Sequence, residues 1–166
     1  MMRVRDAAAG ALAAAMLLTL IGPARADDPG LVSIGAGAWD FDHNRTSAEG
    51  RVEYRFSQGF FFIKPLVGVL ATNDGEIYAY GGLRADLIFA DHYVVMPVAT
   101  VGYYDKGYGK NLGSWLEFKT GAEFAYRFDN AWRVGIAFDH ISNAGLTRTN
   151  PGTENILLVA SMPLGF

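Results

Sequence analysis

His140 and Ser142 are the residues of this 166-residue chain whose types and spacing best suit catalysis. They stand at the end of a stretch, 132–142, that alternates like a β-strand, so their side chains share one face. The earlier positions of that face are all apolar: Trp132, Val134, Ile136 and Phe138. A histidine can take the proton of a serine hydroxyl and so make it a nucleophile for acyl transfer. A base and a nucleophile on an apolar face suit an enzyme that acts on a lipid.

Glu154 can complete this pair as a third member. It opens the last strand-like stretch and has the same parity as the apolar Ile156 and Leu158. Adjacent antiparallel strands would bring Glu154 close to His140 and Ser142 on one outward face. In such a unit the histidine takes the serine proton, and the carboxylate fixes the histidine tautomer. Because a His-x-Ser pair also arises by chance, an incidental pair stays an alternative on these residues alone.

The first 26 residues have the features of a secretory signal peptide. Arg3 and Arg5 precede an apolar run over 7–21, and Ala24-Arg25-Ala26 is a small-residue cleavage site. The run is short for a membrane-spanning helix and is followed by Pro23. We therefore predict a cleaved signal peptide over residues 1–26 and a single mature domain over residues 27–166.

Composition excludes several classes of function. Without residues 1–26 the chain keeps 11 basic and 16 acidic residues, a net charge of −5, so nucleic-acid binding is not expected. The chain has no cysteine, which excludes disulfides and a thiol nucleophile. His43 and His92 fall in a predicted loop and a predicted turn without partners at ligand spacing, so we expect no metal site and no cofactor.

The mature chain divides into strand-like stretches, and no part of it has a helical period with caps. The eight stretches cover 31–42, 47–56, 60–71, 76–89, 93–104, 113–128, 132–142 and 154–166. Tight turns at 57–59, 90–92 and 129–130 alternate with mostly longer loops at 42–46, 72–75, 105–112 and 143–153. Short turns at one end and longer loops at the other are typical of an outer-membrane barrel.

The two faces of most stretches differ in polarity. Over 113–128 the even positions are mostly apolar, while the odd positions include Glu117, Lys119, Glu123 and Arg127. In an eight-stranded membrane barrel the apolar face meets lipid, and the charged face fills an interior in which charges must pair. The expected interior charges are Arg51, Arg55, Arg84, Lys119, Arg127 and Arg133 with Glu53, Asp86, Glu117, Glu123 and Asp139. The stretches 31–42 and 93–104 do not sort into faces.

The pattern as a whole predicts an all-β fold: an eight-stranded antiparallel transmembrane β-barrel of the bacterial outer membrane, preceded by a cleaved signal peptide. The terminal Phe166 ends an alternating strand and resembles the assembly signal of such barrels, so we expect the outer-membrane barrel assembly machinery as a partner during biogenesis. The close balance of interior charges favours a packed interior over a channel.

Two segments resemble a known family. The run Phe138-Asp139-His140-Ile141-Ser142-Asn143-Ala144-Gly145, followed by Asn150-Pro151-Gly152-Thr153-Glu154-Asn155, is similar to the signature of the outer-membrane lipid A 3-O-deacylases (PagL-type). The resemblance implies a Ser–His–Glu triad on the outer surface of the barrel, formed here by Ser142, His140 and Glu154. It also implies lipid A of the outer leaflet as the substrate.

An acyl-transfer site also needs donors for an oxyanion. We assign this role to the backbone N–H groups of Asn143 and Gly145, as the family resemblance also suggests. Asn150 serves either as a side-chain donor or as a brace for the loop. Ordinary turn chemistry is the alternative for all three residues.

The residues predict a membrane-embedded serine esterase, and the family resemblance implies that it removes the 3-O-linked 3-hydroxyacyl chain from lipid A. One alternative is a non-catalytic small barrel in which His140 and Ser142 are incidental. Another is a barrel phospholipase or acyltransferase that uses the same triad on a different lipid. The sequence leaves open whether the protein forms a homodimer.

Overall fold

The computed structural model describes residues 29–43 and 46–164, so the predicted signal peptide and Phe166 lie outside it. No helix long and apolar enough to cross a membrane occurs in these two segments. Their strands are β1 (Leu31–Trp39), β2 (Ser47–Arg55), β3 (Ile63–Thr72), β4 (Ile77–Ala85), β5 (Leu87–Phe89), β6 (Tyr93–Asp105), β7 (Leu116–Arg127), β8 (Arg133–Ser142) and β9 (Thr153–Pro163).

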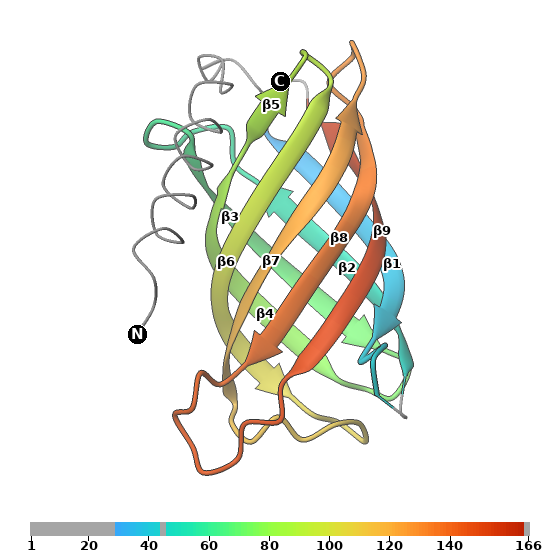
Figure 1. Cartoon of the computed structure of the whole chain (residues 1–166), viewed down its shortest axis with the longest axis vertical. Coiled ribbons are helices and arrows are strands. Elements are labelled where there is room, and N and C mark those ends of the chain that lie inside the picture. The colour runs from blue at the N-terminus through green and yellow to red at the C-terminus, as the bar shows by residue number, and fades with distance from the viewer. Residues whose placement is uncertain (1–28, 44–45, 165–166) are drawn as a thin grey trace, which may run out of the picture.

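These strands close into an antiparallel barrel (Figure 1). β1 pairs with β2 on one side and with β9 on the other, and β4 pairs with β6. β4 and β5 lie end to end along β6 and make one barrel strand, so the barrel has eight strands. The predicted fold class is confirmed. Closure leaves no sheet edge, which is the condition for a β-structure to stand in lipid.

The fourth barrel strand differs from the prediction because it is interrupted. A continuous strand was expected over 76–89, but β4 ends at Ala85 and β5 begins at Leu87. The register on both sides of the break places Ala85 opposite Pro97 of β6. Proline has no N–H to give to a ladder, which accounts for the break at this point.

The predicted division of the strands into a charged inward face and an apolar outward face is confirmed on β7, for which it was made in most detail. On β7, Glu117, Lys119 and Glu123 are buried inside the barrel, while Phe124 and Tyr126 are exposed on its outer wall. The outer wall is therefore apolar and the interior polar, the reverse of a water-soluble β-protein.

Ion pairs fill much of the interior. Arg55 contacts both Glu53 and Glu123, at 2.8 and 2.6 Å, and Asp86 accepts from Arg84 and, at 3.3 Å, from Arg133. Glu49 and Lys64, which the pattern did not assign to the interior, are also buried and paired. The expected pairing fails at one carboxylate: Glu117 is fully buried, and neither of its oxygens has a partner in the described part of the chain.

The two ends of the barrel carry different connections. The segments 106–115 and 143–152 leave the same end, the lower one in Figure 1, which we call the loop end. The opposite turn end holds the shorter links, although 56–62 is longer than predicted because β3 begins at Ile63. At the loop end the interior becomes apolar. The rings of Trp39 and Tyr104 stack with their centroids 6.0 Å apart, and Ile141 belongs to the same cluster.

Candidate active site

His140 and Glu154 are direct partners in the ladder between β8 and β9. The Nδ1 atom of His140 lies 2.8 Å from Oε1 of Glu154, within hydrogen-bond distance. About half of the His140 side chain and about a third of that of Glu154 are exposed, at 47% and 37%. The predicted proximity of these two side chains is confirmed. Because a carboxylate only accepts hydrogen bonds, this contact keeps the ring proton on Nδ1 and leaves the Nε2 lone pair free.

Ser142 ends β8 two residues after His140, on the same outward face. The residues between and before them point the other way: Ile141 is fully buried, and Asp139 pairs with Arg51 inside the barrel at 2.5 Å. The inward side chains fix the end of β8, so the outward ones have fixed directions too. Ser142 is half-buried and, among the described residues, makes no hydrogen bond to His140.

Asn143 ties down the loop that follows Ser142. It is fully buried, and its Nδ2 donates to the carbonyl oxygen of Leu112 at 2.9 Å and to that of Thr149 at 2.8 Å. The side chain thereby joins the loop after β6 to the loop after β8. Asn143 acts as a structural brace behind the candidate nucleophile.

The assigned oxyanion donors are already hydrogen-bonded. The backbone N–H of Asn143 donates to Oδ1 of Asn150, and that of Gly145 donates to Oδ1 of Asn143, both at 3.0 Å. These groups can therefore bind an oxyanion only if the loop opens, and their role stays a prediction. The Nδ2 group of Asn150 makes no hydrogen bond in the described part of the chain. The Asn150 oxygen thus braces the loop, which was one of the two expectations for this residue, while a donor role for its nitrogen stays a prediction.

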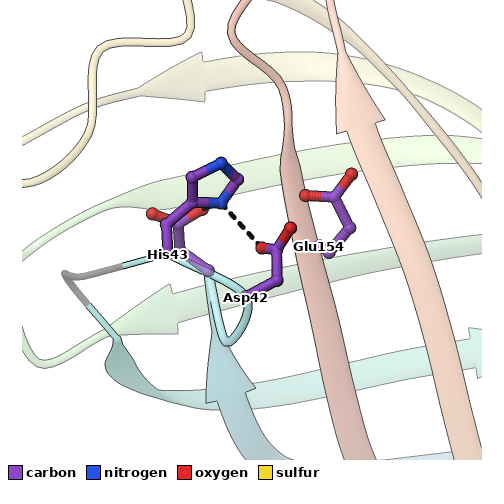
Figure 2. A group of neighbouring side chains, drawn as sticks. Asp42, His43 and Glu154 are labelled. Atoms are coloured by element: carbon purple, nitrogen blue, oxygen red, sulfur yellow. Dashed lines mark hydrogen bonds and ion pairs between the residues drawn. The ribbon is translucent and has the colours of Figure 1, made fainter.

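A second group of polar side chains approaches Glu154 from the segment after β1. Single ligand-type atoms of Asp40, Asp42, His43 and Glu154 all lie within 4.8 Å of one another. Figure 2 shows the carboxylates of Asp42 and Glu154 facing each other, with His43 bonded to Asp42 at 2.7 Å. The ladder continues past Trp39, where the N–H of Phe41 donates to the Glu154 carbonyl at 3.2 Å.

A cationic side chain of the chain itself contacts one of these carboxylates. The Nζ atom of Lys110 lies 2.6 Å from Oδ1 of Asp40, which also accepts from Thr153. Partial desolvation raises the pKa of the Asp42 carboxyl, but hydrogen bonds from His43 and from the backbone outweigh it and lower that pKa below its usual value. Sequence spacing gave His43 no ligand-type partners, whereas the fold brings Asp40, Asp42 and Glu154 close to it. No ion is assigned here, because the Lys110 ammonium already compensates the buried Asp40.

Sequence spacing missed two neighbours of the triad candidates. Asp42 lies more than a hundred positions before Glu154 and reaches it only because β1 pairs with β9. Gly152 lies against the His140 ring. The motif Asn150-Pro151-Gly152 was visible in the sequence, but nothing in it indicated a contact with His140.

Comparisons with known proteins agree with this architecture. The family model described as lipid A 3-O-deacylase (PagL) matches residues 30–163. The crystal structure of the outer membrane enzyme PagL superposes with a TM-score of 0.67 at 20% identity, covering 81% of this chain and 99% of that one. A de novo designed transmembrane β-barrel gives 0.59 at 11% identity, covering 82% and 96%. The Yersinia pestis outer membrane protein Ail gives 0.50 at 10% identity, covering 81% and 99%. Comparison with curated protein sequences gives no match.

Proposed function

Because this chain belongs to the lipid A 3-O-deacylase (PagL) family, we propose that it removes the 3-O-linked 3-hydroxyacyl chain of lipid A with a Ser142–His140–Glu154 triad. The observation that carries the proposal is the 2.8 Å contact between His140 and Glu154 on the outer wall, two residues from Ser142. Lipid A in the outer leaflet would lie against this wall, so no pocket is needed to draw it out of the membrane.

The chemistry follows from the free Nε2 of His140. Ser142 Oγ attacks the ester carbonyl carbon while its proton passes to Nε2, giving a tetrahedral oxyanion. When the carbon–oxygen bond to the sugar breaks, Nε2 returns the proton to the sugar oxygen, and the acyl group stays on Ser142. Water then attacks the acyl-enzyme with His140 as base, which releases a 3-hydroxy fatty acid and restores the serine hydroxyl.

Glu154 and Asn150 take supporting roles in this scheme. The Glu154 carboxylate stabilises the imidazolium that forms when His140 holds two protons. We assign the oxyanion to the Nδ2 group of Asn150, which makes no hydrogen bond among the described residues and lies in the loop after Ser142. If the loop opens, the backbone N–H groups of Asn143 and Gly145 also donate to the oxyanion.

Mass spectrometry of lipid A tests the proposal directly. Outer membranes from cells with the protein should contain lipid A lighter by one 3-hydroxyacyl chain, and free 3-hydroxy fatty acid should accumulate. Unchanged lipid A would contradict the proposal. Loss of acyl chains from phospholipids alone would point instead to a barrel phospholipase.

A further inference from the structure

Gly152 packs directly against the imidazole of His140. It is buried, stands immediately before β9, and has a left-handed backbone with φ of +63°. A Cβ atom at this position would lie 2.8 Å from Cε1 of His140 and 3.4 Å from Nε2. The first distance is shorter than real side-chain contacts allow, so any larger residue would displace its neighbour.

The His140 ring is therefore bounded by two residues of one short segment. Glu154 holds Nδ1 through the 2.8 Å contact, and Gly152 occupies the space beside the Cε1–Nε2 edge. We propose that Gly152 is a positioning residue, whose missing side chain lets the ring stand where Nε2 can take the Ser142 proton. This inference rests on the proposed function.

The ring, and not the backbone, would give way to a larger residue. The imidazole is half exposed and turns about two side-chain bonds, whereas Gly152 is fixed between Pro151 and the first residue of β9. Gly152→Ala should thus yield a folded barrel with a displaced base. A misplacement of about 1 Å in a reacting group can lower the rate about 10²-fold.

Gly75 provides a matched control. Its φ of +87° is also left-handed, and it lies in the connection between β3 and β4, but a Cβ there would meet nothing closer than 3.8 Å. Gly75→Ala therefore also places a side chain on a left-handed backbone, but without a contact to His140. A difference in activity between the two variants measures the ring contact.

The experiment compares both variants with the wild-type chain, purified in detergent and assayed for release of 3-hydroxy fatty acid from lipid A. We expect Gly152→Ala to lower kcat about 10²-fold with KM nearly unchanged, and Gly75→Ala to match wild type. With Glu154→Ala already present, Gly152→Ala should cost much less, because the ring is no longer held. Equal activity of the two glycine variants, or a change confined to KM, would overturn the inference.

Two further measurements separate the possible failures. If Ser142→Ala stays active, the proposed function fails whatever Gly152→Ala does. If Ser142→Ala is inactive and Gly152→Ala equals Gly75→Ala, only the positioning role fails. Should Gly152→Ala not fold, the double variant with His140→Ala decides: recovered heat-modifiable gel mobility supports the ring contact, and continued loss of folding refutes it.

Discussion

Arg51 of β2 and Asp139 of β8 meet across the barrel interior at 2.5 Å, one residue before the outward-facing His140. Arg51 also bonds Glu49, and all three side chains are nearly inaccessible. The position of the candidate base on the outer wall is thereby linked to an ion pair on the inner one.

Asp139→Ala should destabilise the barrel, because it leaves a buried guanidinium with only one carboxylate. Breaking a buried ion pair by removing one partner costs about 3–5 kcal/mol. Urea unfolding in lipid vesicles measures the loss. Asp129→Ala, in an exposed turn, is the control and should stay within about 0.5 kcal/mol of wild type. Equal stability of both variants would show that the Arg51 pair contributes little.

Ser142→Ala should leave the barrel folded and abolish deacylation. Loss of the nucleophile from a Ser–His–acid unit lowers turnover by a factor on the order of 10⁶. Heat-modifiable gel mobility reports folding, and mass spectrometry of lipid A reports activity. A folded variant with normal ester cleavage would refute the nucleophile assignment.

Glu154→Ala and Glu154→Gln should retain residual activity about 10²-fold above that of Ser142→Ala, since the acid member is usually the least costly to remove. Glu154→Asp should recover part of the loss only if the shorter carboxylate still reaches His140. Release of 3-hydroxy fatty acid from lipid A by each purified variant checks the scheme, because Glu154 acts by orienting His140 and stabilising its imidazolium form. If Glu154→Ala equals wild type, the triad reduces to a dyad.

Asn150→Asp separates the two functions of the Asn150 side chain. An aspartate keeps an oxygen for the N–H of Asn143 but loses the Nδ2 donor. If that donor serves the oxyanion, kcat should fall about 10²- to 10³-fold while the folded barrel persists. Asn150→Ala removes the brace as well and should also lower stability. Full activity of Asn150→Asp would show that backbone N–H groups, and not the Asn150 side chain, donate to the oxyanion.

The barrel should not conduct ions. Paired charges such as Arg55 with Glu123 fill an eight-stranded interior, and the buried Trp39–Tyr104 stack occupies it at the loop end. Planar-bilayer recording should show no steady conductance. A reproducible open channel would mean that the interior rearranges in lipid.

Sequence patterns predicted all eight barrel strands, but they assigned faces only to the strands whose two faces differ in chemistry. β7 and β8 alternate between charged and apolar residues, so their faces could be assigned. β1 and β6 could not be sorted because Leu31, Val94 and Met96 are apolar residues that point inward. Where the interior is apolar, both faces of a strand look alike, and only the closed barrel distinguishes them.

The candidate site divides in the same way. The His140–Glu154 contact was predictable because it depends on one ladder between consecutive strands. The approach of Asp42 depends on the pairing of the first strand with the last, which no local pattern encodes. The Gly152 contact depends on a backbone angle within a loop, and the same glycine would suit an ordinary turn.

Strand β8 carries scaffold and candidate site on alternate residues, with Asp139 and Ile141 inward and His140 and Ser142 outward. The same alternation of the strand therefore fixes the direction of both the inward and the outward side chains. Inserting or deleting a single residue within this strand would exchange them, placing a carboxylate in lipid and the imidazole among the interior charges. Point substitutions can change the outward side chains while the inward ones keep the barrel packed. A change in the length of β8 would disrupt both at once.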